Sequence, residues 1–375
     1  MVNMKIKTQE ISLDINNNFN LIKYDGPLMI LISITCLTGI FVLYSASNES
    51  LDVLNRQIFR IFIAFTAMML VSQIPTEVLR KLSPWGYIGG IILLSMVLWL
   101  GEFGQGAQRW LNLGIRFQPS EIMKLSVPMM IAWYLHEKRL PPTGKELIVI
   151  MVLVIIPGLL IARQPDLGTS LLVIAAGLIV VFLSGIPFRY IFSLIILCIP
   201  SSLLLWKFMK DYQRQRVLTL INPDTDPLGA GYNIIQSKIA MGSGGIFGKG
   251  WTNGSQVQLE FLPEKNTDFI FAVVGEEFGL LGVLTILTLY ILIIGRGLYI
   301  ASNASDLYGR LLAGSISLTF FVYVFVNTAM VIGLMPIVGI PLPLISYGGT
   351  SMVTLMIGFG MLMSINSNRK LVAKK

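Results

Sequence analysis

The chain is dominated by apolar runs that follow one another along most of its 375 residues. Each run holds roughly 16 to 26 residues, and a helix of about 20 residues crosses the roughly 30 Å hydrocarbon core of a bilayer. Only 13% of the residues are charged and the mean hydropathy is +0.73, whereas soluble domains carry about 25% charged residues. The sequence therefore predicts an all-α integral membrane protein and excludes a secreted disulfide scaffold, a coiled coil and a disordered chain.

Ten of these runs are predicted to be transmembrane helices, and residues 1–375 to form a single polytopic membrane domain. The first 26 residues are polar and lack the basic start and short apolar stretch of a cleavable signal, so the first helix is expected to stay. The predicted spans lie near residues 27–45, 57–75, 85–101, 119–135, 146–162, 168–185, 189–206, 267–295, 309–334 and 345–365.

The distribution of lysine and arginine predicts the orientation of these helices. If the N-terminus is cytoplasmic, the inner segments hold 15 of the 28 basic residues and the short outer loops with adjoining helix ends hold five. This excess follows the positive-inside rule, so we expect both termini to be cytoplasmic in a multi-pass protein of the cytoplasmic membrane. The net charge of +8 is spread over the inner loops, which favours contact with membrane lipids and argues against a nucleic-acid partner.

Few side chains offer nucleophilic or metal chemistry. Cys36 and Cys198 each lie inside an apolar run, so neither a disulfide framework nor a cysteine-rich metal site is predicted. The single histidine, His136, lies beside Glu137 at the polar end of an apolar run. That position is typical of a solvated helix end rather than of a catalytic triad or a zinc site.

Segment 207–266 is the long polar stretch of the chain, and the predicted topology makes it an extracytoplasmic loop between spans seven and eight. Its spaced apolar residues predict short amphipathic helices on the membrane surface, forming an ordered cap. Residues 242–250 contain five glycines around Lys249. Such a loop can direct backbone N–H groups at an anion, and tight turns would require the same glycines, so both interpretations stay open.

Asp268 stands at the outer start of the predicted eighth span, where Asn266 or Thr267 can cap the helix and leave Asp268 free to face inward. An ionisable residue at membrane depth is a functional candidate, although an acid at a helix start is also favoured by the helix dipole. Glu276 and Glu277 lie about 12 to 14 Å further along the same helix and cannot both share the face of Asp268. We expect at least one of them to be a structural pairing residue.

Charged residues near the fourth and sixth spans form a second group of candidates. Glu121 and Lys124 are three residues apart and share a helical face, so they form either a buried ion pair or a substrate contact. Arg109, Arg163 and Asp166 complete the outer set, and Asp166 can instead cap the sixth span.

The segment that joins the last two spans cannot be one continuous helix, because it contains Pro336, Pro341 and Pro343. Apolar, proline-broken backbone at membrane depth must be buried in protein or line a cavity. We therefore expect residues 339–351 to wall the same outer cavity that Asp268 faces.

Five groups of motifs, in order along nearly the whole chain, resemble the SEDS family of cell-wall polymerases, and its rod-shape branch more than its division branch. The family's usual Gly-Leu-Pro reads Gly-Ile-Pro at 339–341, a mild departure. The motifs are LYSAS at 43–47, AQRW at 107–110 with FQPSEIMK at 117–124, QPDLGT at 164–169, the GSGG and TDFIF runs at 242–245 and 267–271, and ISYGGTS at 345–351.

The resemblance implies a peptidoglycan glycosyltransferase that polymerises lipid II, a disaccharide-pentapeptide on undecaprenyl diphosphate, at the outer membrane face during cell elongation. Asp268 matches the family's essential aspartate and would take the proton from the acceptor's 4-hydroxyl. One carboxylate suffices, because a diphosphate leaves without protonation, unlike the leaving group of glycoside hydrolysis. The substrate-binding candidates are Arg109, Glu121, Lys124, Asp166, Arg214, Arg216 and Lys249.

The family also implies a partner, a class B penicillin-binding transpeptidase, and Mg²⁺ can share the neutralisation of the diphosphates. Two other functional classes stay open at this stage. A lipid II flippase would need a polar route to both membrane faces, whereas the buried charges lie mainly in the outer half. A non-catalytic scaffold for cell-wall enzymes would have no need of Asp268.

Overall fold

The computed structural model describes residues 23–104, 107–112, 116–187, 189–190, 196, 206–207, 209, 211–226 and 229–368. Within this part of the chain, seven helices are long and apolar enough to cross a membrane. They are α1 (Gly26–Ala46), α2 (Leu51–Ser72), α3 (Thr76–Leu100), α5 (Gly144–Arg163), α11 (Ile270–Ser302), α12 (Leu307–Val331) and α13 (Thr350–Ser367).

Two further helices match predicted spans without meeting the same length and hydropathy criteria. They are α4 (Pro119–His136) and the shorter apolar α6 (Leu167–Leu183). The predicted span at 189–206 falls almost entirely outside the described residues. The helical membrane fold is thus confirmed, and the count of ten spans stays a prediction.

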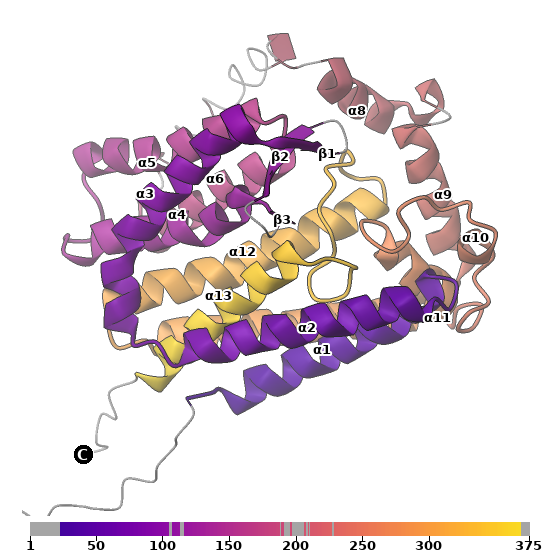
Figure 1. Ribbon diagram of the computed structural model, residues 1–375, viewed down its shortest axis with the longest axis horizontal. Helices are drawn as coiled ribbons and strands as arrows, with labels where there is room; N and C mark the ends of the chain where they lie inside the picture. The colour runs from indigo at the N-terminus through magenta and orange to yellow at the C-terminus, as the bar shows by residue number, and fades with distance from the viewer. Residues whose placement is uncertain are drawn as a thin grey trace, which may run out of the picture.

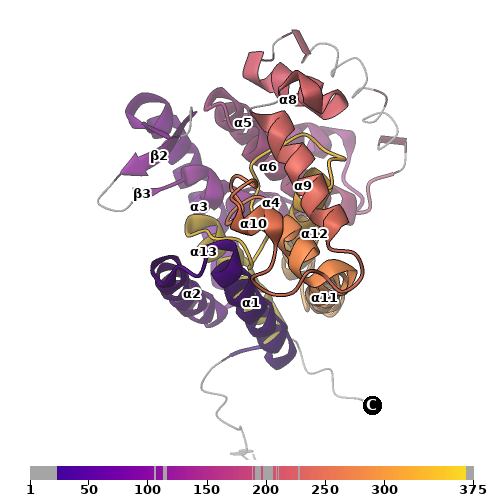
Figure 2. The same ribbon diagram turned by 90° about the vertical axis from the view of Figure 1, so that its right-hand side faces the viewer.

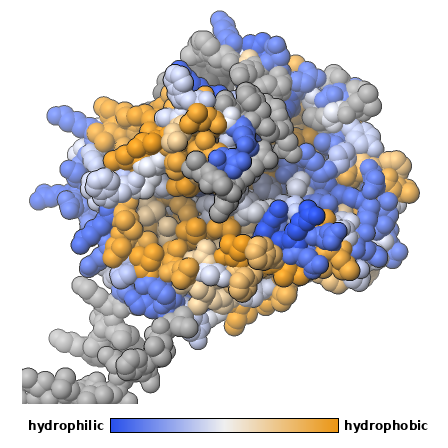
Figure 3. Space-filling view, in the orientation of Figure 1, coloured by the Kyte–Doolittle hydropathy of each residue, from blue (hydrophilic) through white to orange (hydrophobic). Residues whose placement is uncertain are grey.

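The helices form two groups that meet along α12. Helices α11 and α13 run beside α12, and α1 and α2 pack against these two helices, while α3 to α6 pack as a second group that reaches α12 through α4 and α6 (Figure 1). Hydrophobic residues cover the middle of the visible face and hydrophilic residues gather toward its two ends (Figure 3). This distribution is the one expected of a bundle whose middle lies in hydrocarbon.

Charged and amide side chains join the first and last described helices at one end of the bundle. Asp25 caps α1 by accepting a hydrogen bond from the Leu28 N–H. Its carboxylate also accepts from Arg296 at 3.1 and 2.7 Å and from Asn366 at 2.7 Å. The start of α1 and the end of α13 therefore lie together, at the end opposite α9 and α10 (Figure 1). The assignment of this end to the cytoplasm stays a prediction.

The connection between α3 and α4 adds to the predicted helical fold a small three-stranded antiparallel sheet that the sequence did not indicate. The strands are β1 (Glu102–Gly104), β2 (Ala107–Asn112) and β3 (Arg116–Phe117). Glu102 pairs with Trp110, and Leu111 with Phe117. Strands of two to six residues are too short for their alternation to stand out in sequence beside apolar runs of helical length.

The long polar segment contains short helices, as predicted for 207–266. They are α8 (Asp211–Ile221), the 3₁₀ turn η1 (Pro223–Thr225), α9 (Ala230–Ser243) and α10 (Ser255–Gln258). Helices α9 and α10 lie at one end of α11 and α12, and α8 lies beyond α9 (Figures 1 and 2). Ser237 of α9 fastens them there by donating a hydrogen bond to the Val331 carbonyl at 2.8 Å.

Helix α11 differs in two ways from the predicted span 267–295. It begins at Ile270 with Phe269 in the N-cap position, so neither Asn266 nor Thr267 caps it. It is also kinked at Gly279, which adopts φ 61° and ψ −155°. A Cβ atom at Gly279 would lie 2.4 Å from the backbone nitrogen of Gly248. Glycine is therefore required here, because the glycine-rich segment of the cap enters against the kink.

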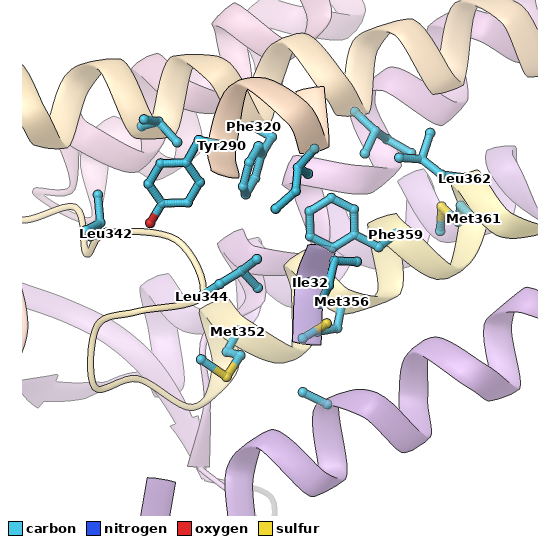
Figure 4. Packing of buried hydrophobic residues seen from close by; sticks show 14 of the residues in the cluster. Ile32, Tyr290, Phe320, Leu342, Leu344, Met352, Met356, Phe359, Met361 and Leu362 are labelled. Atoms are coloured by element: carbon cyan, nitrogen blue, oxygen red, sulfur yellow. The ribbon is translucent and has the colours of Figure 1, made fainter. Parts of the chain in front are cut away.

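Helix α13 begins at Thr350 rather than at the predicted residue 345, because the prolines and Gly348-Gly349 prevent an earlier helical turn. The preceding loop rests on an aromatic core in which Tyr290, Phe320 and Phe359 pack edge to face, with ring centroids 5.6 and 5.2 Å apart (Figure 4). The Tyr290 hydroxyl donates a hydrogen bond to the Pro343 carbonyl at 2.6 Å. The core thus holds a loop that has no secondary structure of its own.

Candidate active site

Asp268 lies in the turn 264–269 that joins the cap to α11, and only 8% of its surface is exposed. The N–H groups of Thr267 and Phe269 close the turn by donating to the Glu264 carbonyl at 3.0 and 3.3 Å. The pKa of Asp268 is raised to about 7, mainly by burial and in part by the Glu264 carboxyl, while the charge of Arg216 opposes the rise. A carboxyl group with this pKa exchanges a proton near neutral pH, as a general base requires.

The loop 332–349 forms the opposite wall of this site. A Cβ atom at Gly339 would lie 3.6 Å from Asp268 Oδ2, so the loop backbone passes directly beside the carboxylate. The Tyr347 N–H donates to the Asn266 carbonyl at 2.8 Å, and the Ser346 hydroxyl donates to the Thr267 carbonyl at 2.5 Å. The loop and Asp268 are thus adjacent, and the prediction that both face one outer cavity stays a prediction.

Three polar residues inside apolar helices help to hold the loop, and sequence reasoning did not select them. Gln57 of α2 donates to the Ser346 carbonyl at 3.2 Å, and Arg60 of α2 lies 4.2 Å from the centroid of the Tyr347 ring. Asn327 of α12 bonds to both walls of the site. The sequence did offer a signal for them, because each is a polar side chain within a predicted span. Burying such a group in lipid costs free energy, so its presence indicates a partner inside the protein.

Glu121 and Lys124 form a buried ion pair on α4, with Nζ 2.6 Å from Oε1 and side-chain exposures of 9% and 8%. The Lys124 ammonium also lies 5.1 Å from the centroid of the Tyr323 ring on α12. The predicted shared helical face is confirmed. A contact with substrate is not tested by this geometry, and that part of the hypothesis stays a prediction.

Asp166 both caps a helix and pairs with a cation. Its carboxylate accepts from the Thr169 N–H at 3.2 Å at the start of α6, which confirms the predicted cap. It also accepts from Gln118 at 3.0 Å and lies 3.6 Å from Arg109 Nε. Asp166 therefore links the sheet, the start of α4 and the start of α6.

A cleft of about 360 Å³ is lined mainly by residues of α2, α4 and α13. Its polar lining includes Arg60, Gln118 and Glu121, and the rest is mainly isoleucine, phenylalanine and valine. Smaller cavities continue past Lys124 and Tyr323 to Pro341 and Ser346 of the loop. The loop therefore lies between the cavity beside the Glu121–Lys124 pair and the Asp268 turn.

Lys249 has a different environment from the one an anion site requires. Its ammonium lies 2.7 Å from Glu276 Oε1, and its N–H and that of Gly250 donate to the Glu276 and Glu277 carbonyls, each at 3.0 Å. Glu277 in turn accepts a hydrogen bond from Ser45 of α1. These N–H groups serve the close packing of the cap on α11, and Glu276 is the structural pairing residue that we expected.

The two arginines of α8 lie in different surroundings. Arg214 donates to the carbonyls of Trp206 and Lys207, each at 3.0 Å, and lies 3.8 Å from Asp211. It therefore stabilises its own segment of chain. Arg216 is the basic candidate whose charge acts on Asp268.

These features define a polytopic membrane protein with a buried acid held between a cap at one end of the bundle and a proline-rich loop. Comparison with known proteins identifies the class, because the model of the FtsW, RodA and SpoVE family, described as a cell cycle protein, matches residues 27–371. The chain belongs to this family.

Two relatives illustrate the similarity in sequence. The chain is 52% identical over 351 residues to the peptidoglycan glycosyltransferase MrdB of Escherichia coli K12, covering 93% of this chain and 95% of the relative. It is 34% identical over 357 residues to the probable peptidoglycan glycosyltransferase FtsW of Geobacter sp. M18, covering 92% and 96%. The higher identity to MrdB agrees with the predicted rod-shape branch.

Solved structures show the same fold. A chain from work on the structural coordination of polymerization and crosslinking by a peptidoglycan synthase complex matches with a TM-score of 0.81 and 32% identity, covering 93% of this chain and 99% of that one. The crystal structure of the Thermus thermophilus rod shape determining protein RodA matches with a TM-score of 0.71 and 26% identity, covering 92% and 97%.

Proposed function

We propose that Asp268 is the general base of this protein and that its substrate is lipid II, polymerised into glycan strands for cell elongation. The protein is a multi-pass inner-membrane enzyme, a peptidoglycan glycosyltransferase, as its membership of the family and its 52% identity to MrdB indicate. The single observation that supports the base assignment is the burial of Asp268, which raises its pKa to about 7.

The proposed reaction forms one C–O bond, breaks another and transfers one proton. The acceptor's 4-hydroxyl oxygen attacks the donor's anomeric carbon, and its proton passes to the Asp268 carboxylate. The bond from that carbon to the diphosphate oxygen breaks with inversion, and undecaprenyl diphosphate leaves with the electron pair. Arg216 is placed to neutralise charge beside the base, while Arg109, Glu121, Lys124 and Asp166 would bind substrate around the cleft.

A divalent cation such as Mg²⁺ would supply further neutralisation of the diphosphate. Among the described residues, no three or more histidine, cysteine, aspartate or glutamate side chains converge as a ligand set. Mg²⁺ commonly binds through one or two carboxylates together with substrate phosphates and water.

The topology belongs to the same proposal. Ten spans with both termini in the cytoplasm would put segment 207–266 and Asp268 on the outer face, where lipid II is used. The observed helix ends support this arrangement, because α9 and α10 lie opposite the start of α1 and the end of α13 (Figure 1). A class B penicillin-binding transpeptidase is the proposed partner, supported by the similarity to a chain from a synthase complex that coordinates polymerization and crosslinking.

Substitution of the base tests the proposal. Asp268→Asn keeps the size of the side chain and removes its basicity, so polymerisation of lipid II by the purified protein with its partner should fall by about 10² to 10⁴. Lipid II binding should survive, since the proposed phosphate ligands are other residues. Asp211→Asn, an exposed acid of the same cap, is the matched control and should keep the wild-type rate.

The rate should also depend on pH in a defined direction. Asp268 acts only when deprotonated and has a pKa of about 7, so the wild-type rate should fall as pH drops through 7 and level off above it. An Asp268→Asn protein that polymerises at more than about a tenth of the wild-type rate lies outside the range for a lost general base. Glu264 and Glu276 would then be the next candidates.

A further inference from the structure

Asn327 is a fully buried polar residue on α12, with 0% of its surface exposed. Its side-chain nitrogen donates a hydrogen bond to the Asp268 carbonyl at 2.9 Å and another to the Ile340 carbonyl at 2.7 Å. Both acceptors are carbonyl oxygens, which only accept, so the NH₂ group of the amide must face them. One side chain therefore uses both of its N–H groups to join the two walls of the site.

The two acceptors belong to different segments, and each adjoins a group that matters for the chemistry. One is the carbonyl of the proposed base itself. The other is the carbonyl of Ile340, which follows Gly339. A Cβ atom at Gly339 would lie 3.6 Å from Asp268 Oδ2. The other contacts between the walls, from Ser346 and Tyr347, involve Thr267 and Asn266. Asn327 is thus the contact that acts on Asp268 directly.

We propose that Asn327 is a positioning residue for Asp268, clamping the turn that carries the carboxylate against the loop that covers it. The proposal rests on the proposed function, because it concerns the same base. The side-chain oxygen of Asn327 has no hydrogen-bond partner among the described residues. A buried amide in an apolar helix with half of its polar capacity unused is not explained by stability alone, since such a group costs free energy.

Loss of the clamp should change the chemistry of the base as well as its position. Without the two hydrogen bonds the turn can separate from the loop, and water then reaches the carboxylate. The charged groups that act on Asp268 are Glu264 and Arg216, while α12 and the loop present Asn327 and Gly339, which do not titrate. Reduced burial should therefore move the apparent pKa of the base toward its lower ordinary value.

The test compares Asn327→Leu, which keeps the size and removes the hydrogen bonds, with Ser315→Ala. Ser315 is a matched control on the same helix, also fully buried and bonded to a carbonyl, that of Ala176, at 3.0 Å. In Asn327→Leu, kcat should fall by about tenfold or more with little change in KM. A displacement of a catalytic group by about 1 Å can lower the rate by as much as about 10²-fold. The midpoint of the kcat–pH profile should move to lower pH by about half a unit or more. Ser315→Ala should change neither quantity.

A second variant and one further measurement keep the proposal falsifiable. Tm and partner co-purification report whether each variant folds. If Asn327→Leu does not fold, Asn327→Ala, which leaves room for water, replaces it and should show the same fall in kcat and the same shift of the midpoint. A folded Asn327 variant with wild-type kcat and an unchanged midpoint would overturn the clamp. The clamp would also be overturned if both Asn327 variants lost activity only in proportion to their lower Tm, with no change in the midpoint. Asp268→Asn is assayed alongside, and its inactivity beside a normal Asn327 variant would sink this inference while leaving the proposed base intact.

Discussion

The buried carboxylate of Asp268 predicts that removal of its charge will stabilise the protein while abolishing activity. In the unfolded chain this carboxyl ionises at its ordinary pKa of 3.8, whereas in the folded protein burial raises the pKa to about 7. Between these values the folded state binds the proton more tightly, so stability is lost as pH rises through the window and the full loss is reached above about pH 7. Asparagine carries no charge and avoids this loss.

The size of the effect follows from the two pKa values. At about 1.36 kcal/mol per pKa unit, the ionised Asp268 destabilises the folded state by about 4 kcal/mol at pH 8 and by roughly 1.5 kcal/mol at pH 5. Asp268→Asn should therefore unfold at a temperature higher by roughly 5 to 10 °C at pH 8, with a smaller gain at pH 5. The gain is expected because active sites commonly sacrifice stability for function.

Thermal unfolding in detergent at the two pH values measures this effect, with Asp166→Asn as the matched control. Asp166 is equally buried, at 5% exposure, but its carboxylate has three partners, Thr169, Gln118 and Arg109. Its replacement should lower Tm at both pH values, because those partners lose a charge that they stabilise. An Asp268→Asn protein that is no more stable than wild type at pH 8, or whose gain is the same at both pH values, would refute the reasoning.

Three further predictions concern other parts of the molecule. If Glu121 and Lys124 bind substrate as well as each other, the double exchange Glu121→Lys with Lys124→Glu should abolish polymerisation in a folded protein, and near-normal activity would leave them a structural pair. Cysteines at Asn253 and Thr143, both exposed, should react with impermeant reagents from opposite sides of the membrane, Asn253 from outside; labelling from one side would exclude the ten-span topology. Lys249→Met leaves the fully buried Glu276 without its ammonium partner and should lower the free energy of unfolding by about 3 kcal/mol. The loss is measured as a lower Tm, and an unchanged Tm would contradict it.

Much of the architecture was predictable from the sequence because lipid imposes a simple rule on it. A segment inside the bilayer must pair its backbone polar groups within the protein, and a run of about 20 apolar residues does so as a helix, so most helix positions follow from hydropathy without knowledge of neighbours. The same rule makes an acid such as Asp268 conspicuous, and the motif order identified the family. The proline-rich loop does lie beside this acid, because non-helical backbone at membrane depth must be buried in protein or line a cavity.

Tertiary structure alone decided which side chains meet. The amide of Asn327 reaches a carbonyl 59 residues away and that of Gln57 reaches one 289 residues away, and no local pattern encodes such pairings. The pairing of Lys249 with Glu276 was equally unpredictable from the sequence. A glycine-rich segment can bind an anion or pack closely against a helix backbone, and only the observed packing against α11 distinguishes the two. The start of α11 at Ile270 was missed for the same reason. Long-range hydrogen bonds to the loop hold Asp268 outside the helix, in the position where burial changes its acidity.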